Sequence, residues 1–181
     1  MNEAQASPET LETSALDAYH AQAWHRAAEG FMQAAAAYQA ASNHNKWAEM
    51  RNNACVAYLQ DGDGQAALSA VEGTSQAFIE LGDQRRAAQA HGNRAAALEA
   101  CGRLQEAEGA YRLAAEGMRL AGDHEARSDT LKALAQLQLK RGRAMDAVAS
   151  MGQELETRRR PSLAQRFLRW LTRLAMRLLG G

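Results

Sequence analysis

Small residues recur every 40 positions through most of this 181-residue chain. The most regular are four alanines, at Ala27, Ala67, Ala107 and Ala147. A bulkier apolar residue follows each alanine four positions later, at Phe31, Val71, Tyr111 and Met151. A fixed period of this length is typical of a stacked array of similar helical units. Because such arrays present surfaces that hold other molecules, the repeat favours a binding protein over an enzyme.

The composition and the turn residues predict an all-α fold. Proline breaks helix interiors, and neither proline lies in one: Pro8 stands at the first position of the first predicted helix, and Pro161 lies beyond the repeats. Short turns with glycine, aspartate or asparagine separate the apolar stretches, as expected between one helix end and the next helix start. We therefore predict helices over residues 8–21, 24–41, 45–60, 64–81, 84–100, 104–121, 124–140 and 144–157. In pairs, they form four helical hairpins that stack into a superhelix.

The hairpins resemble tetratricopeptide repeats. Each first helix carries a small residue in the same register, at Ala15, Cys55, Ala95 and Ala135. The third repeat matches the motif most fully, with Ala95, Leu98, Gly102, Leu104, Ala107, Tyr111 and Ala114. The first repeat departs from it, because Gln22 stands where the turn glycine belongs, and the proline usual at the end of each repeat is absent. The resemblance implies an all-α tetratricopeptide-type superhelix over roughly residues 8–157.

Within that family, the repeat is similar to the kinesin light chain subgroup. Its period is 40 rather than the more common value of about 34, the joint at residues 81–83 reads Leu-Gly-Asp, and Asn53 and Asn93 lie in the first helices. The size and layout also resemble small bacterial kinesin light chains that accompany bacterial tubulin. That resemblance implies a protein partner of the tubulin-filament type and attachment of the filaments to the inner face of the cell membrane.

The inner face of the superhelix is the predicted protein-binding surface, because first helices line that face in a stacked array. Polar residues recur there in the register of the repeat, and the candidates are Arg51, Asn53, His91, Asn93, Arg94 and Lys132. An asparagine amide both donates and accepts, so Asn53 and Asn93 suit a clamp on the backbone of an extended peptide. Asn53 and Asn93 form a ladder of asparagines with the period of the repeat, and this ladder stops in the fourth repeat, where Ala133 stands at the equivalent position. The alternative is that these residues only solvate the inner face.

Charge divides the chain into two parts, although its formal net charge is zero. Residues 158–181 hold seven of the 21 basic residues and none of the 21 acidic ones, so this segment is +7 and the rest of the chain is −7. The pattern predicts a flexible N-terminus over residues 1–7, the repeats over 8–157, and a basic linker with an amphipathic helix over 158–181. Charge asymmetry of this kind favours an anionic partner for the segment, or docking on its own acidic body.

Residues 162–179 have the pattern of a helix that lies in a membrane surface. Arginines form one narrow stripe and apolar residues cover most of the remainder; the predicted membrane-binding residues are Arg166, Phe167, Arg169, Trp170, Leu171, Arg173, Leu174, Arg177 and Leu178. The arginines suit anionic headgroups, and the apolar face suits the acyl boundary. Two alternatives remain open. The helix either caps the last repeat, as terminal elements of arrays do, or docks on the acidic body until a partner releases it.

Motifs for other functions are weak or missing. The segment Asp61-Gly62-Asp63-Gly64 is similar to the start of a calcium loop, but Ala66 stands at the required glycine, so we interpret it as a turn. The five histidines and two cysteines have no metal-ligand spacing, and no phosphate loop or nucleophile motif occurs. We expect no cofactor, no metal, no nucleic acid and no enzymatic activity. With no signal sequence at its start and no apolar run of spanning length, the chain is expected in the cytoplasm, peripheral to the inner membrane face.

The sequence thus predicts a non-enzymatic adaptor whose repeats bind a protein and whose last residues attach the complex to a membrane. The alternative is a chaperone or regulatory module in which residues 162–179 plug the molecule or enter the groove of a partner.

Overall fold

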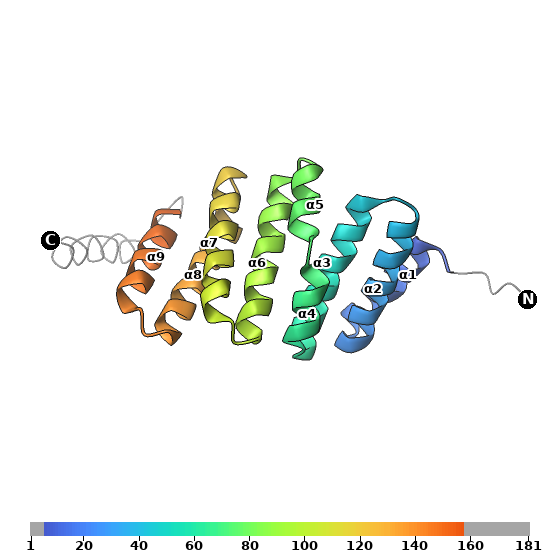
Figure 1. The fold of residues 1–181 in the computed structure, drawn as a ribbon, viewed down its shortest axis with the longest axis horizontal. Helices are drawn as coiled ribbons and strands as arrows, with labels where there is room; N and C mark the ends of the chain where they lie inside the picture. The colour runs from blue at the N-terminus through green and yellow to red at the C-terminus, as the bar shows by residue number, and fades with distance from the viewer. Residues whose placement is uncertain (1–5, 158–181) are drawn as a thin grey trace, which may run out of the picture.

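The computed structural model describes residues 6–157, which form a curved array of helices without strands (Figure 1). Its helices are α1 (Pro8–His20), α2 (Trp24–Ala40), α3 (His44–Asp61), α4 (Gly64–Val71), α5 (Thr74–Glu80), α6 (Gln84–Ala100), α7 (Leu104–Leu120), α8 (His124–Lys140) and α9 (Ala144–Thr157). The predicted all-α superhelix is therefore confirmed. The predictions for residues 1–5 and for the basic segment 158–181 lie outside the described residues.

Side-chain caps and left-handed turns set most helix boundaries. The carboxylate or amide oxygens of Asn43, Asp63, Asp83 and Asp123 each accept a hydrogen bond from the backbone N–H three residues later. Gly62, between α3 and α4, has a φ of 85°, which costs a side chain about 1–2 kcal/mol. Gly62 and Asp63 thus form a turn between α3 and α4, within the predicted turn segment Asp61-Gly62-Asp63-Gly64, whose end residues belong to the two helices. Gln22 and Ser42 occupy the same left-handed region at the first two joints, without being glycine.

The predicted single helix over residues 64–81 is wrong, because the structure breaks it into α4 and α5. Glu72 is extended, with φ −60° and ψ 131°, and Gly73 is left-handed, with a φ of 78°. The indole of Trp47 lies beside the break, 3.6 Å from the place where a Cβ on Gly73 would stand. A sequence pattern of helical period does not reveal this break, since glycine is tolerated inside helices at a cost of only about 1 kcal/mol.

Arg51 and Thr74 satisfy the backbone groups that the break exposes. The guanidinium of Arg51 donates to the carbonyl oxygens of Ser69 and Ala70, at 2.6 and 2.7 Å. The Thr74 hydroxyl, fully buried, donates to the Val71 carbonyl at 2.8 Å. Because the last carbonyls of a helix lack partners within it, these bonds stabilise the end of α4.

The register alanines lie in the core, as the sequence predicts. Ala27, Ala67 and Ala107 are fully buried, and Ala147 nearly so. Close helix approaches depend on other small residues: a Cβ on Gly30 would lie 2.9 Å from the Cβ of Ala15, which is closer than real carbon atoms approach. Two large buried clusters result. One extends over α1, α2, α3 and α4 and includes Ala97 of α6, and the other joins α6, α7 and α8.

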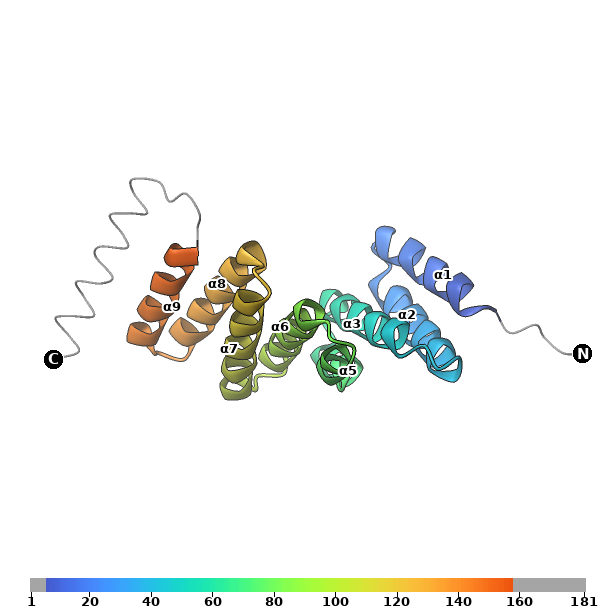
Figure 2. The same ribbon diagram turned by 90° about the horizontal axis from the view of Figure 1, so that it is seen from above.

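Viewed from above, the array bends into a shallow arc (Figure 2). The first helices α1, α3, α6 and α8 lie toward its inner side, whereas α5 and α7 lie toward its outer side. This arrangement places the predicted binding positions of the first helices toward the concave side. None of the helices within residues 8–157 is both long enough and apolar enough to cross a bilayer.

Candidate protein-binding surface

A small apolar groove lies between α1 and α3, near the N-terminal end of the array. It has a volume of about 230 Å³, and its lining residues are Leu16, Tyr19, His20, Phe31, Asn53 and Val56. The Tyr19 ring is held in place by aromatic packing against Trp24, with ring centres 5.1 Å apart, and against Phe31. Aromatic and aliphatic walls with a few polar groups are typical of a site that receives an apolar side chain.

Asn53 is the only amide among the residues that line this groove. Within residues 6–157 its side chain makes no hydrogen bond, so the amide has both a donor and an acceptor to offer a ligand. Asn93, its counterpart 40 residues on, is engaged differently: its amide nitrogen donates to Asn52 Oδ1 at 3.0 Å. The two asparagines of the predicted ladder therefore do not act alike. Asn53 is available to a ligand, and Asn93 connects α6 to α3.

Arg51 has a structural role in the fold. Besides bonding the carbonyls at the end of α4, its guanidinium lies 5.1 Å from the centre of the Trp47 ring. Burial lowers the pKa of Arg51 below its ordinary value, with partial compensation from the negative charge of Glu72. A side chain held by two carbonyls and an indole is poorly placed to bind a partner as well.

His91, Arg94 and Lys132 are half-buried on α6 and α8. Burial lowers the pKa of His91, and the positive charge of Arg94 lowers it further, so the imidazole is neutral at pH 7. Its Nδ1 atom is buried and meets no hydrogen-bond partner in the part of the chain that the structure describes. Lys132 forms an ion pair with Asp129 at 2.6 Å. Of the six predicted inner-face residues, Asn53 is thus the one that combines an unpaired amide with a groove.

A buried carboxylate in the third repeat was not predicted from the sequence. Glu108 on α7 is 3% exposed and forms ion pairs with Arg112, Arg141 and Arg143, while Gln138 donates to it at 3.2 Å. The Glu108–Arg112 and Glu108–Arg143 distances are 2.6 and 2.8 Å. Its counterparts one and two repeats earlier are Leu68 and Ala28. That break in an apolar register position is the signal that could have identified it.

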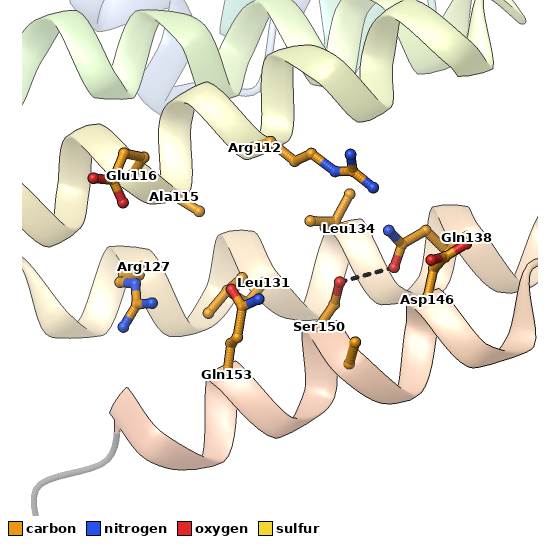
Figure 3. Close-up of a pocket in the computed structure, with 11 residues that line it drawn as sticks. Arg112, Ala115, Glu116, Arg127, Leu131, Leu134, Gln138, Asp146, Ser150 and Gln153 are labelled. Carbon is orange, nitrogen blue, oxygen red and sulfur yellow. Dashed lines mark hydrogen bonds between the residues drawn. The ribbon is translucent and has the colours of Figure 1, made fainter. Parts of the chain in front are cut away.

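A second groove, of about 330 Å³, is lined by residues of α7, α8 and α9 (Figure 3). Leu131 and Leu134 of α8 form its apolar floor, and polar side chains from α7 and α9 flank it. The Ser150 hydroxyl donates to Gln138 Oε1 at 2.8 Å across the groove. Acidic and basic groups both line it, including Glu116, Asp146 and Arg112, so it has no single charge preference.

The predicted membrane-binding residues, from Arg166 to Leu178, lie outside the described residues. Among residues 6–157, no group of three or more potential metal ligands comes together. Cys55 is buried, and burial raises the pKa of its thiol to about 12, so that thiol is unreactive at neutral pH.

The sequence also matches a family model over residues 3–165, which is most of the chain, and that model describes the soluble NSF attachment proteins. The chain belongs to this family. Among curated proteins, no sequence matches it.

Solved structures show the same fold. Kinesin light chain TPR-like repeats from Podospora anserina superpose with a TM-score of 0.72 at 20% identity, over 97% of this chain and 91% of that one. The apo form of RapI superposes with the same TM-score at 11% identity, over 97% of this chain but only 48% of that one. The chain thus spans about half of RapI. These likenesses confirm the predicted tetratricopeptide-like fold and its similarity to kinesin light chain repeats. Folds of this kind typically serve protein–protein interaction.

Proposed function

We propose that this protein is an adaptor that binds an extended segment of a partner protein on the inner face of its repeats. The observation that carries the proposal is the unpaired Asn53 amide at the edge of the apolar groove between α1 and α3. An extended peptide exposes a backbone N–H and C=O that one amide side chain can pair with together. The groove then receives a neighbouring apolar side chain between Tyr19 and Val56.

Selection of random peptides on the immobilised protein tests this proposal. Peptides that bind the wild type should lose most of their affinity for Asn53→Ala, because each amide–backbone hydrogen bond contributes about 1 kcal/mol or more. Gln33→Ala is the matched control, since it removes an exposed amide from the second helix α2. Selected peptides that bind Asn53→Ala and Gln33→Ala equally well would contradict a site at Asn53.

The second part of the proposal is attachment to an anionic membrane through residues 162–179. The support is the sequence pattern, in which arginines follow one stripe and Trp170 with several leucines covers the other face. Removal of residues 162–181 is expected to abolish flotation with anionic vesicles and to leave a folded array. A truncated protein that still floats would contradict the assignment.

Two partners are candidates for the inner face. The resemblance of the sequence to small bacterial kinesin light chains is the basis for a filament of bacterial tubulin. Membership of the soluble NSF attachment protein family supports an NSF-type partner, as the family name says. Co-sedimentation separates them: the full-length protein pellets with assembled tubulin filaments in the first case and not in the second. Binding to purified NSF in place of filaments would replace the tubulin proposal while retaining the adaptor role.

The alternative role, a chaperone or regulatory module, makes a different prediction about the basic segment. It predicts no vesicle binding by the full-length protein, and a binding surface that becomes accessible only after residues 162–181 are removed. Equal peptide binding by the full-length and truncated proteins would exclude it.

A further inference from the structure

One core position of the repeat is exposed only in the last described repeat. Phe31, Val71 and Tyr111 are 1%, 3% and 7% exposed, whereas Met151, the next residue in this register, is 37% exposed. The same change occurs at the start of the second helices, where Gly64 is buried and its counterpart Ala144 is exposed. In the third repeat, helix α8 of the following hairpin packs on α7 and shares a buried cluster with Tyr111. The end face of the array, formed by Ala144, Val148 and Met151, lacks such a cover within residues 6–157.

The sequence beyond α9 continues the register of α8. The buried residues of α8 are Ser128, Thr130, Leu131, Leu134, Ala135, Leu137 and Gln138. Forty residues on, six of these seven positions carry apolar residues, namely Leu168, Trp170, Leu171, Leu174, Ala175 and Leu178. Ala175 also continues the series of small residues Ala15, Cys55, Ala95 and Ala135. Arg177, at the position of Leu137, is the one departure.

The residue that precedes this segment also follows the register of the earlier repeats. Ser42, Gly82 and Gly122 have left-handed backbones at the three earlier joints, and Ser162 follows in the same register. Ser42 shows that serine adopts this conformation in this chain, with a φ of 57°. Leu163 stands at the position of the capping residues Asn43, Asp83 and Asp123, and a leucine side chain cannot accept the hydrogen bond that caps α3, α6 and α8. A helix without this cap is easier to detach than its counterparts.

We propose that residues 162–179 dock on the end face as the first helix of a fifth repeat. Leu171, Leu174 and Ala175 then take the places that Leu131, Leu134 and Ala135 have in the third-to-fourth repeat interface. Arg169 falls at the position of Asp129, which is exposed.

Docking and membrane binding exclude each other, and this part of the inference rests on the proposed function. Trp170, Leu171 and Leu174 provide the apolar surface for both contacts, so one helix cannot make both at once. Anionic vesicles therefore compete with the end face for residues 162–179.

Cysteine crosslinking in the full-length protein tests the docked register. Met151→Cys and Leu174→Cys are introduced together with Cys101→Ser, and the buried, unreactive Cys55 is retained. Tyr111 and Leu134, the register counterparts of the new pair, lie in one buried cluster. A short bismaleimide is expected to form an intramolecular crosslink, detected by mass spectrometry. The matched control is Met145→Cys with Leu174→Cys, because Met145 is exposed on the same helix and its counterpart Gln105 is exposed too.

Preferential crosslinking of the 151–174 pair supports docking. Equal crosslinking of both pairs, a crosslink only between two molecules, or none at all would overturn it. Met151→Lys supplies a second readout without new cysteines: it should release the segment and increase the fraction of protein that floats with anionic vesicles. An unchanged floating fraction would contradict the competition between the end face and the membrane for residues 162–179.

Failure of docking and failure of the membrane proposal give different results. Crosslinking without flotation retains the docked helix and removes the membrane role, whereas flotation without crosslinking does the reverse. Where both occur, vesicles should abolish the 151–174 crosslink. Its persistence on floated protein would overturn the competition.

Discussion

The second and third repeats share a period but differ in their second helices. In the second repeat this helix is broken at Glu72 and Gly73, whereas α7 continues through the equivalent positions, Arg112 and Leu113. The first helices explain the difference. Trp47 and Arg51 of α3 support the break, and their counterparts on α6 are Ala87 and His91.

A small residue permits the unbroken packing of the third repeat. A Cβ on Gly117 of α7 would lie 2.8 Å from the Cβ of Ala88, which shows how closely α7 approaches α6 there. In the second repeat, Ala77 replaces this glycine and the Trp47 indole lies next to the break. The 40-residue period therefore sets where the helices lie. Side chains of the neighbouring helix, such as Trp47 and Arg51, decide whether a second helix is continuous or broken.

Trp47→Ala is expected to have the largest effect on this difference. Removal of the half-buried indole should lower the free energy of unfolding by about 3 kcal/mol, because a cavity forms between α3 and α5. Urea unfolding followed by circular dichroism measures the change. A loss below about 1 kcal/mol would show that the indole does not support the break.

Arg51→Ala should have the next largest effect. It leaves the Ser69 and Ala70 carbonyls without their donor and is expected to cost about 2 kcal/mol in urea unfolding. His91→Ala, at the equivalent position of the intact third repeat, is the matched control and should cost less. Arg51→Lys should recover only part of the loss, since an ammonium lacks the planar fork of the guanidinium. Equal losses for Arg51→Ala and His91→Ala would contradict the capping role.

Gly73→Ala tests the backbone of the break itself. Its φ of 78° belongs to the left-handed region, where a side chain costs about 1–2 kcal/mol. Leu113→Ala is the control in α7 and should be nearly neutral, because Leu113 is exposed and alanine favours helices. If Gly73→Ala stabilises the protein, the helix is continuous in solution and the break is absent.

The smallest expected effect is the pH dependence that His91 introduces. Its pKa is lower in the folded than in the unfolded protein, so the unfolded chain binds more protons below its ordinary pKa of about 6.5. The stability of the folded protein should therefore fall as the pH decreases below that value. His91→Leu, which copies Leu131 of the fourth repeat, should weaken this decrease in thermal unfolding between pH 7 and 5. An unchanged pH profile would show that His91 is not the group responsible.

Helix register and inner-face positions were predictable from the sequence, because small residues and turn residues repeat every 40 positions. Asn53 was found in this way. The sequence did not reveal that Asn93 is hydrogen-bonded to Asn52 whereas the Asn53 amide is unpaired, because a register pattern treats equivalent positions alike. The break at Gly73 and the buried Glu108 were missed for a related reason. Both depend on contacts with side chains from other parts of the fold: Trp47 and Arg51 of α3 in one case, and Arg141 and Arg143 of the joint between α8 and α9 in the other.

Hydrogen–deuterium exchange with a selected peptide tests the central claim most directly. The full-length protein is compared with and without a peptide selected on the wild type, because binding at the groove should slow amide exchange in its walls. The account predicts protection in α1 around Leu16 to His20 and in α3 around Asn53 to Val56. Protection confined to the groove between α7 and α9, with no change in α1 and α3, would contradict it.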